Sequence, residues 1–159
     1  MDKIVIDANT GAEAIISMIN LDTLIPLSVT GTSMLPFILP NDVVWLKKYD
    51  YSVLHEGQIV LFRREGETGF VLHRVFEVID DNYVRINGDA QVKCELIERS
   101  QIIAVVQQIV RNGKILDTDK SEERDKLRKW KKTRLLRPVL IRLFMLKNRR
   151  VLKLGAETD

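Results

Sequence analysis

The chain has 159 residues, of which 45% are hydrophobic and 30% charged; this balance suits one folded domain with a tail and excludes a disordered or fibrous chain. A single cysteine, Cys94, excludes an internal disulfide and fits a reducing compartment. No apolar stretch reaches the roughly 18 residues that a membrane-spanning helix needs, and the first residues lack the features of a secretory signal.

The net charge of +3 conceals two regions of opposite charge. Residues 120–153 contain 14 Lys and Arg residues and three acidic ones, a local charge of +11, so the remaining residues must sum to −8. We therefore divide the chain into a domain at residues 1–118 and a basic helical tail at residues 119–159.

The first expected element is a short helix at about residues 11–20. Thr10 and Glu13 have the spacing of a capping box, in which the hydroxyl and the carboxylate bind free N–H groups at a helix start. The apolar run that follows, Ala14 to Ile19, would form the buried face of this helix.

From Ile25 onward, short runs rich in β-branched and aromatic residues alternate with turn residues, which is typical of β-strands. The loop at 112–113 is Asn-Gly, the pair that best tolerates the positive φ angles of a two-residue hairpin turn. Many short antiparallel strands with tight turns indicate a mainly β, coiled or barrel-like fold. The expected strands cover residues 25–30, 42–48, 58–64, 70–79, 83–87, 102–110 and 114–117.

The tail predicts two helices. Ser121-Glu122-Glu123 resembles a helix start, and a basic helical segment follows it. Pro138 has no backbone N–H to donate, so it should interrupt this helix, and a second helix should restart there and continue to Lys147.

Ser33 is the candidate nucleophile, within Thr30-Gly31-Thr32-Ser33-Met34-Leu35-Pro36. A serine hydroxyl needs a base to take its proton and N–H groups to stabilise the oxyanion. Gly31 would let the backbone bend sharply before Ser33. Taken alone, such a serine is more often an ordinary turn residue.

His73 is the candidate base because the chain has only two histidines and His55 lies in a predicted surface loop. A lone strand histidine is, however, more often a hydrogen-bonded core residue. A histidine base usually needs a carboxylate on its second ring nitrogen. Asp89 follows a strand end that should return beside His73, and Glu95 is a weaker candidate; ordinary turn and loop roles remain open for both.

The order of six short sequence boxes resembles the catalytic domain shared by type I signal peptidases and LexA-like repressors. These boxes are GTSMLP at 31–36, NDVV at 41–44, GQIVLF at 57–62, VLHRV at 71–75, Gly-Asp at 88–89 and IIAVV at 102–106. The resemblance covers residues of about 25 to 110. It implies a mainly β fold of coiled antiparallel sheets with a short N-terminal helix and a basic C-terminal helical tail.

The resemblance also implies an activity, that of a serine endopeptidase that cleaves a leader or signal-like peptide without a metal or cofactor. Histidine in the fourth box is similar to the endoplasmic-reticulum and archaeal type, whereas most bacterial members have lysine there. Ser33 would attack the peptide carbonyl and His73 would accept its proton. Asp89 matches the family's Gly-Asp acid, and Glu95 stands where this type has a second acid.

The resemblance further implies that backbone N–H groups near Ser33 hold the oxyanion, with Gly31, Thr32 and Met34 lining the oxyanion and substrate site. This chain has Asn41 and Gln58 where family members usually have Gly and Asp, respectively. Signal peptidases normally carry a membrane-spanning anchor, and this chain more closely resembles small stand-alone bacterial relatives with a basic tail. Maturation of a leader-bearing peptide therefore fits this resemblance as well as secretory processing does.

Two other functions remain open. The first is a non-catalytic binding or regulatory module on the same fold, which the departures from the family pattern favour. The second is a LexA-like self-cleaving regulator, which would need a DNA-binding domain in the roughly 32 residues ahead of Ser33. We rank the self-cleaving regulator lowest because that segment is short and lacks an obvious Ala-Gly or Cys-Gly cleavage site.

The tail mixes basic and apolar positions over residues 120–153. One interpretation is peripheral contact with an anionic membrane, in which basic residues attract lipid headgroups and apolar residues insert. The other is that the apolar side packs on the β-domain. Nucleic acid is not expected, because no aromatic platform or groove-reading motif accompanies the charge. We expect a cytoplasmic protein, with possible attachment to the inner membrane face.

Overall fold

The computed structural model describes residues 12–19, 23–50, 52–116 and 121–153. Eight antiparallel strands form one sheet in the order β1-β2-β7-β3-β4-β5-β6, and β8 also pairs with β7. The mainly β fold expected from the sequence is therefore confirmed. The strands are β1 Ile25–Ser28, β2 Val43–Lys48, β3 Ile59–Phe62, β4 Val71–Val78, β5 Tyr83–Asn87, β6 Glu95–Glu98, β7 Ile102–Arg111 and β8 Lys114–Leu116.

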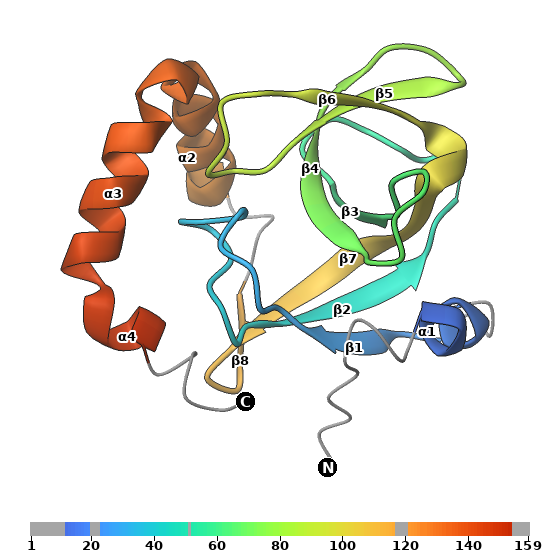
Figure 1. Cartoon of the computed structure of the whole chain (residues 1–159), viewed down its shortest axis with the longest axis horizontal. Helices are drawn as coiled ribbons and strands as arrows, with labels where there is room; N and C mark the ends of the chain where they lie inside the picture. Colours follow the sequence, from blue (N-terminus) through green and yellow to red (C-terminus); the bar gives the residue numbers. More distant parts are fainter. Residues whose placement is uncertain (1–11, 20–22, 51, 117–120, 154–159) are drawn as a thin grey trace.

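The sheet is strongly curled, so that β5 and β6 arch over β3 and β4 (Figure 1). Register shifts in the pairings β2–β7, β3–β7 and β4–β5 accompany this curvature. An extra residue in one strand bends that strand and increases its twist. The long strand β7 lies at the centre of the order and pairs with β2 and β3 on its two sides.

Apolar residues of β3 face two separate cores because successive strand residues point to opposite sides of a sheet. Ile59 and Leu61 belong to a cluster with α1 and β2, whereas Val60 and Phe62 belong to a cluster with β4, β5 and β6. All four residues of β3 are buried. The candidate site lies at the ends of the strands around this doubly covered segment.

The N-terminal helix α1, Ala12–Ile19, lies within the range predicted for it, and Ile15 and Ile19 bury its apolar face against the first cluster. Thr10 of the predicted capping box and the proposed boundary at 118/119 lie outside the described residues. Asn41, at the position where the resemblance leads us to expect glycine, has a φ of 71°. Asparagine tolerates this left-handed region better than most residues, so the departure is compatible with the turn.

Strand β6 is the one strand of the described sheet that the sequence did not predict. It pairs with residues 83–86 of β5 and places Glu95, expected in a loop, at its first position. Of its four residues only Ile97 is fully buried. The hairpin turn at Asn112-Gly113 was predicted correctly, since both residues have positive φ.

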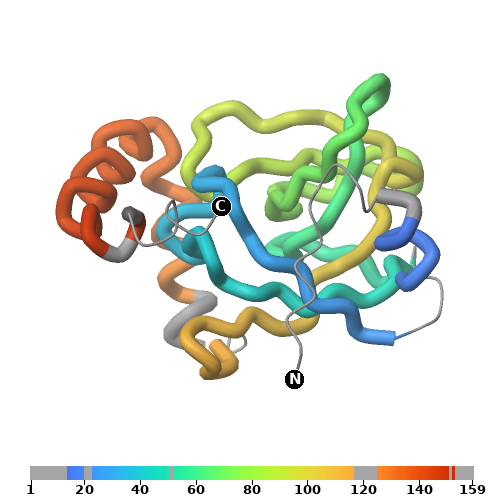
Figure 2. Tube along the Cα trace, turned by 60° about the horizontal axis from the view of Figure 1, so that its bottom comes forward, coloured from blue at the N-terminus to red at the C-terminus, as the bar shows by residue number. Residues whose placement is uncertain are grey.

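The C-terminal helices gather at one end of the molecule, and α1 lies at the opposite end (Figures 1 and 2). They are α2 Ser121–Lys132, a 3₁₀ turn at Arg134–Leu136, α3 Arg137–Lys147 and α4 Arg149–Lys153. Pro138 occupies the first turn of α3, as the sequence predicted. Among the helices of the described ranges, none has both the length and the apolar character needed to cross a bilayer.

Candidate functional site

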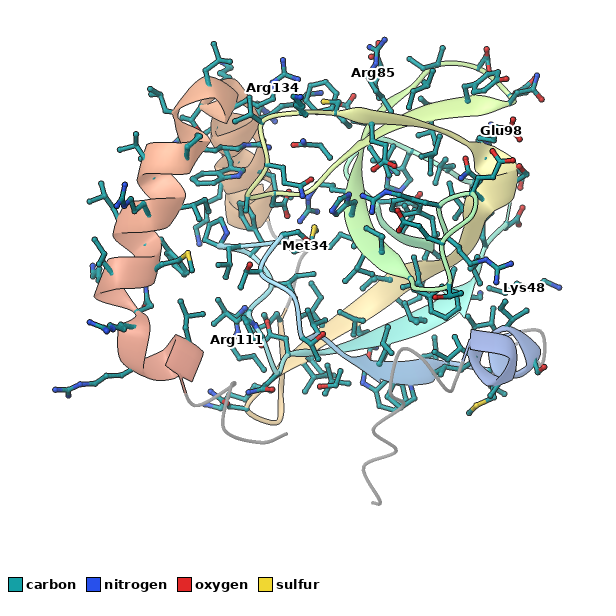
Figure 3. The ribbon with its side chains drawn as sticks, in the orientation of Figure 1. Met34, Lys48, Arg85, Glu98, Arg111 and Arg134 are labelled. Atoms are coloured by element: carbon teal, nitrogen blue, oxygen red, sulfur yellow. The ribbon has the colours of Figure 1, made fainter. Side chains whose placement is uncertain are left out.

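Ser33 lies in the segment that joins β1 to β2, which we call the serine turn (residues 29–42). Two hydrogen bonds to Met34 O, from the N–H groups of Phe37 and Ile38 at 3.1 and 3.0 Å, wind the chain tightly after Ser33. Met34 and Leu35 are fully buried, whereas Thr32 is exposed and Ser33 is half-buried. The buried neighbours anchor the turn and leave the serine at the surface. Figure 3 labels Met34 between the sheet and the C-terminal helices.

The backbone beside Ser33 has unused donors. Among the described residues, the N–H groups of Ser33 and Met34 have no hydrogen-bond acceptor, although the N–H of Leu35 donates to Thr32 O at 3.2 Å. Free N–H groups that point to one place are what stabilises a developing oxyanion. The serine turn therefore carries both a hydroxyl and the donors that acyl chemistry requires.

A buried ion pair holds the end of the serine turn to β7. Asp42 is 2% exposed and accepts two hydrogen bonds from Arg111, at 2.9 and 2.7 Å, and one from the Leu39 N–H at 2.7 Å. Arg111 also donates to Phe37 O at 2.9 Å. Because one guanidinium binds both a carboxylate and a backbone carbonyl, the turn has a fixed position relative to the sheet.

A second turn, at residues 87–91 after β5, contacts Ser33 directly; we call it the acid turn because it contains Asp89. The Ala90 N–H donates to Ser33 O at 2.8 Å. A Cβ atom on Gly88 would lie 2.8 Å from the same oxygen and 2.9 Å from Gln91 Oε1. Only glycine lets the two turns approach this closely, because a backbone oxygen cannot move aside as a flexible side chain can.

His73 lies on β4, next to the acid turn. Arg74, the strand neighbour of His73, is paired with Asn87, where the pairing of β4 with β5 ends. Asn87 is also the first residue of the acid turn, which contacts Ser33 through Ala90. The acid turn therefore links the serine turn to the part of β4 that carries His73.

The His73 side chain is buried on the apolar side of β4. It is 2% exposed, and its ring centroid is 5.9 Å from that of Phe62. Nδ1 is enclosed and has no hydrogen-bond partner among the described residues. A buried polar atom without a partner is uncommon in folded proteins and requires an explanation.

The environment of His73 keeps its imidazole neutral. Burial lowers the pKa of His73 from 6.5 to about 4, and the positive charge of Arg64 acts in the same direction. The carboxylates of Glu95 and Asp89 oppose this shift but do not overcome it. At neutral pH the ring therefore has a free lone pair, which a general base needs.

Asp89 is paired with an arginine, not with the histidine. Arg74 Nε and Nη2 donate to the two oxygens of Asp89 at 2.9 and 2.7 Å, and Asp89 is 3% exposed. Arg74 also donates to Gly57 O at 2.9 Å and lies over the Phe37 ring at 5.5 Å. The carboxylate that the sequence assigned to His73 instead fixes the acid turn to β4.

Glu95 is likewise paired with an arginine. Arg64 Nε and Nη2 donate to its two oxygens at 2.7 and 3.0 Å, which joins the start of β6 to the end of β3. Both side chains are about one third exposed. Glu95 thus influences His73 through its charge and makes no hydrogen bond to it in the described structure.

The C-terminal helices complete the acid turn from outside. Trp130 Nε1, on α2, donates to Asp89 O at 2.7 Å, and its ring contacts Phe37 edge-on at 6.0 Å. Arg137 is 3% exposed and donates to Asn87 Oδ1 and to Gln91 O. The basic tail therefore packs on the β-domain beside the site.

The structure thus brings together some of the predicted site residues and separates others. Ser33, Asp89 and the strand position of His73 share one neighbourhood, but neither carboxylate binds the imidazole. The chain bends at Thr32 and turns from Ser33 onward, as expected, but Gly31 is exposed, lacks a positive φ, and a Cβ there would meet no atom within 4 Å, so the bend does not require glycine at this position.

Sequence reasoning missed four residues that hold the site, and two of them left a signal. Arg74 directly follows His73 in a strand, so it must point to the opposite face. Arg137 interrupts an apolar run, which is where a buried cation would be found. Arg111 and Trp130 left no signal, because their partners lie 69 and 41 positions away.

Three cavities of the described structure lie beside the site rather than at it. One, of about 730 Å³, lies between α1, the β3–β4 loop and residues 98–103, and its lining includes Arg64 but neither Ser33 nor His73. The other two are likewise lined by neither residue. Within the described ranges, no three His, Cys, Asp or Glu side chains gather as ligands for a metal ion.

No protein-family model matches this chain, and a search of curated proteins found no relative with significant sequence similarity. The function must therefore be inferred from the residues and their geometry.

Proposed function

We propose that this chain is a serine endopeptidase of the signal-peptidase type, in which Ser33 is the nucleophile and His73 the general base. The observation that carries this proposal is the pair of contacts at Ser33 O. Its hydrogen bond with Ala90 and its close approach to Gly88 hold the serine turn to the acid turn, whose first residue, Asn87, pairs with Arg74 next to the neutral, buried His73.

The reaction would proceed through an acyl-enzyme. Ser33 Oγ attacks the carbonyl carbon of the scissile bond while its proton passes to the imidazole of His73. The free N–H groups of Ser33 and Met34 are the donors available for the oxyanion. The imidazolium then protonates the leaving amine, and a water molecule, activated in the same way, releases the acyl group.

Packing, rather than a carboxylate, would orient the base. Phe62 and the buried strand around His73 restrict the imidazole ring, while Asp89 and Glu95 are held by arginines. The low pKa of His73, about 4, keeps the ring unprotonated across the physiological range. It also makes the ring a weak base, so proton transfer depends on the oxyanion donors and on water exclusion by the bound peptide.

A free strand edge supplies a docking place for an extended peptide. The last residue of β5, Asn87, lies opposite Arg74, so Val71, Leu72 and His73 pair only with β3 in the described sheet. An extended peptide adds readily to such an edge through its main-chain hydrogen bonds. This edge includes His73, so a peptide bound there would pass beside the proposed base.

We infer a leader or signal-like peptide as substrate, and a site of action in the cytoplasm or at the inner membrane face. Both inferences come from the sequence resemblance. The free edge supports an extended substrate, because it offers main-chain pairing and no deep specificity pocket.

The direct test is cleavage of a peptide library by the full chain, followed by mass spectrometry. Ser33→Ala should abolish cleavage while circular dichroism shows an unchanged fold, because the small alanine side chain replaces a half-buried hydroxyl. Ser52→Ala, at an exposed serine far from the site, is the matched control and should cleave normally. Cleavage retained in Ser33→Ala would exclude Ser33 as nucleophile.

A non-catalytic binding module is the second candidate, and one observation favours it. No carboxylate orients the imidazole, and no hydrogen bond joins Ser33 to His73 in the part of the chain that the structure describes. Such a module would bind extended peptides at the β4 edge without cleaving them. Binding of library peptides by both wild type and Ser33→Ala, with no cleavage by either, would identify it.

A further inference from the structure

Helix α3 has apolar side chains on two faces, and only one of them is covered. Leu140, Ile141 and Phe144 are partly buried and form its inner face. A helix that is apolar on all sides is normally covered on all sides. The outer face of α3 is therefore the unusual feature of this end of the molecule.

The outer face carries a continuous apolar row, which we call the outer stripe. Its members, two on the 3₁₀ turn and three on α3, recur at intervals of three and four residues, which places them on one side of this helical segment. Each is more than half exposed, and no described residue covers them. The outer stripe consists of Leu135 (78% exposed), Leu136 (60%), Val139 (62%), Leu143 (58%) and Leu146 (64%).

Single exposed apolar residues are normal on protein surfaces, but a row of five is not. Elsewhere in the described structure, large exposed apolar side chains such as Val53, Leu96 and Ile115 are on separate elements. In Figure 3 the side chains on the outer side of α3 stand clear of the ribbon. The row is therefore a surface that a partner could cover.

The basic residues beside the outer stripe indicate which kind of partner it binds. Residues 126–153 contain no Asp or Glu. Arg142 and Lys147 lie on α3, Arg149 and Arg150 follow it on α4, and all four are exposed. An apolar stripe bordered by cations matches a surface with apolar chains beneath anionic groups, which is the boundary of an anionic bilayer.

A second copy of this chain fits the outer stripe less well. A two-fold symmetric dimer would place α3 against α3 and bring the same basic residues together. No acidic side chain of residues 126–153 would offset the repulsion between these basic residues. Contact with the acidic domain of another copy would be head-to-tail and would build a ring or a filament rather than a two-fold dimer.

We propose that the outer stripe docks this protein onto an anionic membrane surface, with α3 lying in the headgroup region. This surface needs no peptidase activity. If the proposed function also holds, docking would keep the serine site at the membrane, because Arg137, the first residue of α3, binds the acid turn that contacts Ser33.

The test is co-sedimentation of the full chain with vesicles of phosphatidylcholine alone or of equimolar phosphatidylcholine and phosphatidylglycerol. We expect pelleting with the anionic vesicles and at least a tenfold smaller bound fraction with the neutral ones. Val139→Ser with Leu143→Ser should lose binding to the anionic vesicles. The matched control is Val53→Ser with Ile115→Ser, which removes equally exposed apolar side chains from the β-domain and should bind normally.

Three results would overturn the proposal. Equal pelleting of wild type and Val139→Ser/Leu143→Ser would show that charge alone attracts the protein. No pelleting with anionic vesicles would exclude the membrane as partner. A lipid-free dimer that becomes monomeric in Val139→Ser/Leu143→Ser, seen by analytical ultracentrifugation, would identify the outer stripe as a contact between copies. Peptide cleavage without lipid, measured in parallel, separates failure of docking from failure of the proposed activity.

Discussion

His73 and Arg74 are consecutive residues of β4 with opposite surroundings. His73 lies among apolar side chains, its Nδ1 has no partner in the described structure, and burial lowers its pKa to about 4. Arg74, on the other face of the strand, binds both oxygens of Asp89 and the Gly57 carbonyl. The polar face of β4 therefore fixes the backbone around the site, while the apolar face keeps a neutral imidazole beside it.

The difference separates two tasks that a histidine-bound carboxylate combines in serine enzymes with a catalytic triad. Here arginines hold Asp42, Asp89 and Glu95, and these pairs position the turns. Asp89 and Glu95 affect the pKa of His73 only through their long-range charges. A substitution on one face of β4 should therefore leave the contacts of the other face unchanged.

The largest effect should follow from removing the base. His73→Gln should reduce kcat for peptide cleavage by about 10⁶-fold, because loss of the histidine base in a serine enzyme costs on this order. His55→Gln, at an exposed histidine, is the matched control and should retain full activity. Comparable activity in the two variants would remove His73 from the mechanism.

The next effect concerns the polar face. Arg74→Ala should destabilise the fold by about 3 kcal/mol, since it leaves the nearly buried Asp89 carboxylate without a partner. Arg74→Met with Asp89→Leu should recover part of that loss, because neither charge remains buried. Chemical denaturation measures both. Arg85→Ala, which breaks an exposed pair with Glu77, should change stability by less than about 1 kcal/mol.

The burial of His73 on the apolar face of β4 predicts how the stability of the fold depends on pH. The unfolded chain takes up a proton on His73 near pH 6.5, whereas the folded protein does so only near the lowered pKa of about 4. The unfolded state therefore binds more protons between these values, and stability should fall as the pH drops from 6.5 to 4. The shift corresponds to roughly 3 kcal/mol. In His73→Leu, thermal melts should lack this part of the acid sensitivity; an unchanged pH dependence would contradict the neutral, buried imidazole.

The smallest effects should come from the charges near His73. Arg64→Gln removes a cation that lowers the pKa of His73, so that pKa should rise; Glu95→Gln removes an anion that raises it, so the pKa should fall. Each change should be well under one unit if water screens these half-exposed groups. NMR titration of the ring protons measures both shifts. Shifts of the same sign in the two variants would show that the pair acts on His73 through structure rather than charge.

The sequence predicted the elements more completely than the contacts between them. The strands with alternating apolar residues, such as Tyr83–Asn87, were located correctly because their pattern has a period of two. Strand β6 was missed because its glutamates at positions 95 and 98 conceal the single fully buried residue, Ile97. The alternation of apolar and polar residues reveals a strand only where burial also alternates along that strand.

The candidate site was predictable as a set of residues but not as a set of bonds. The two proposed reactive residues carry their own signal: a serine two positions after a glycine, and one of only two histidines. The partner of Asp89 depends on which face of β4 the acid turn meets, which only the folded register determines. The free backbone N–H groups at Ser33 and Met34 likewise depend on the shape of the turn, so the residue types do not reveal them.

The most direct test of the central claim is the rate at which a fluorophosphonate probe labels Ser33 at different pH values, with the adduct located by peptide mass spectrometry. We expect one adduct, on Ser33, formed at a rate that rises with pH around the lowered pKa of His73, about 4, and at least about 10³-fold slower labelling in His73→Gln. Absence of label, or equal labelling of wild type and His73→Gln, would contradict activation of Ser33 by His73.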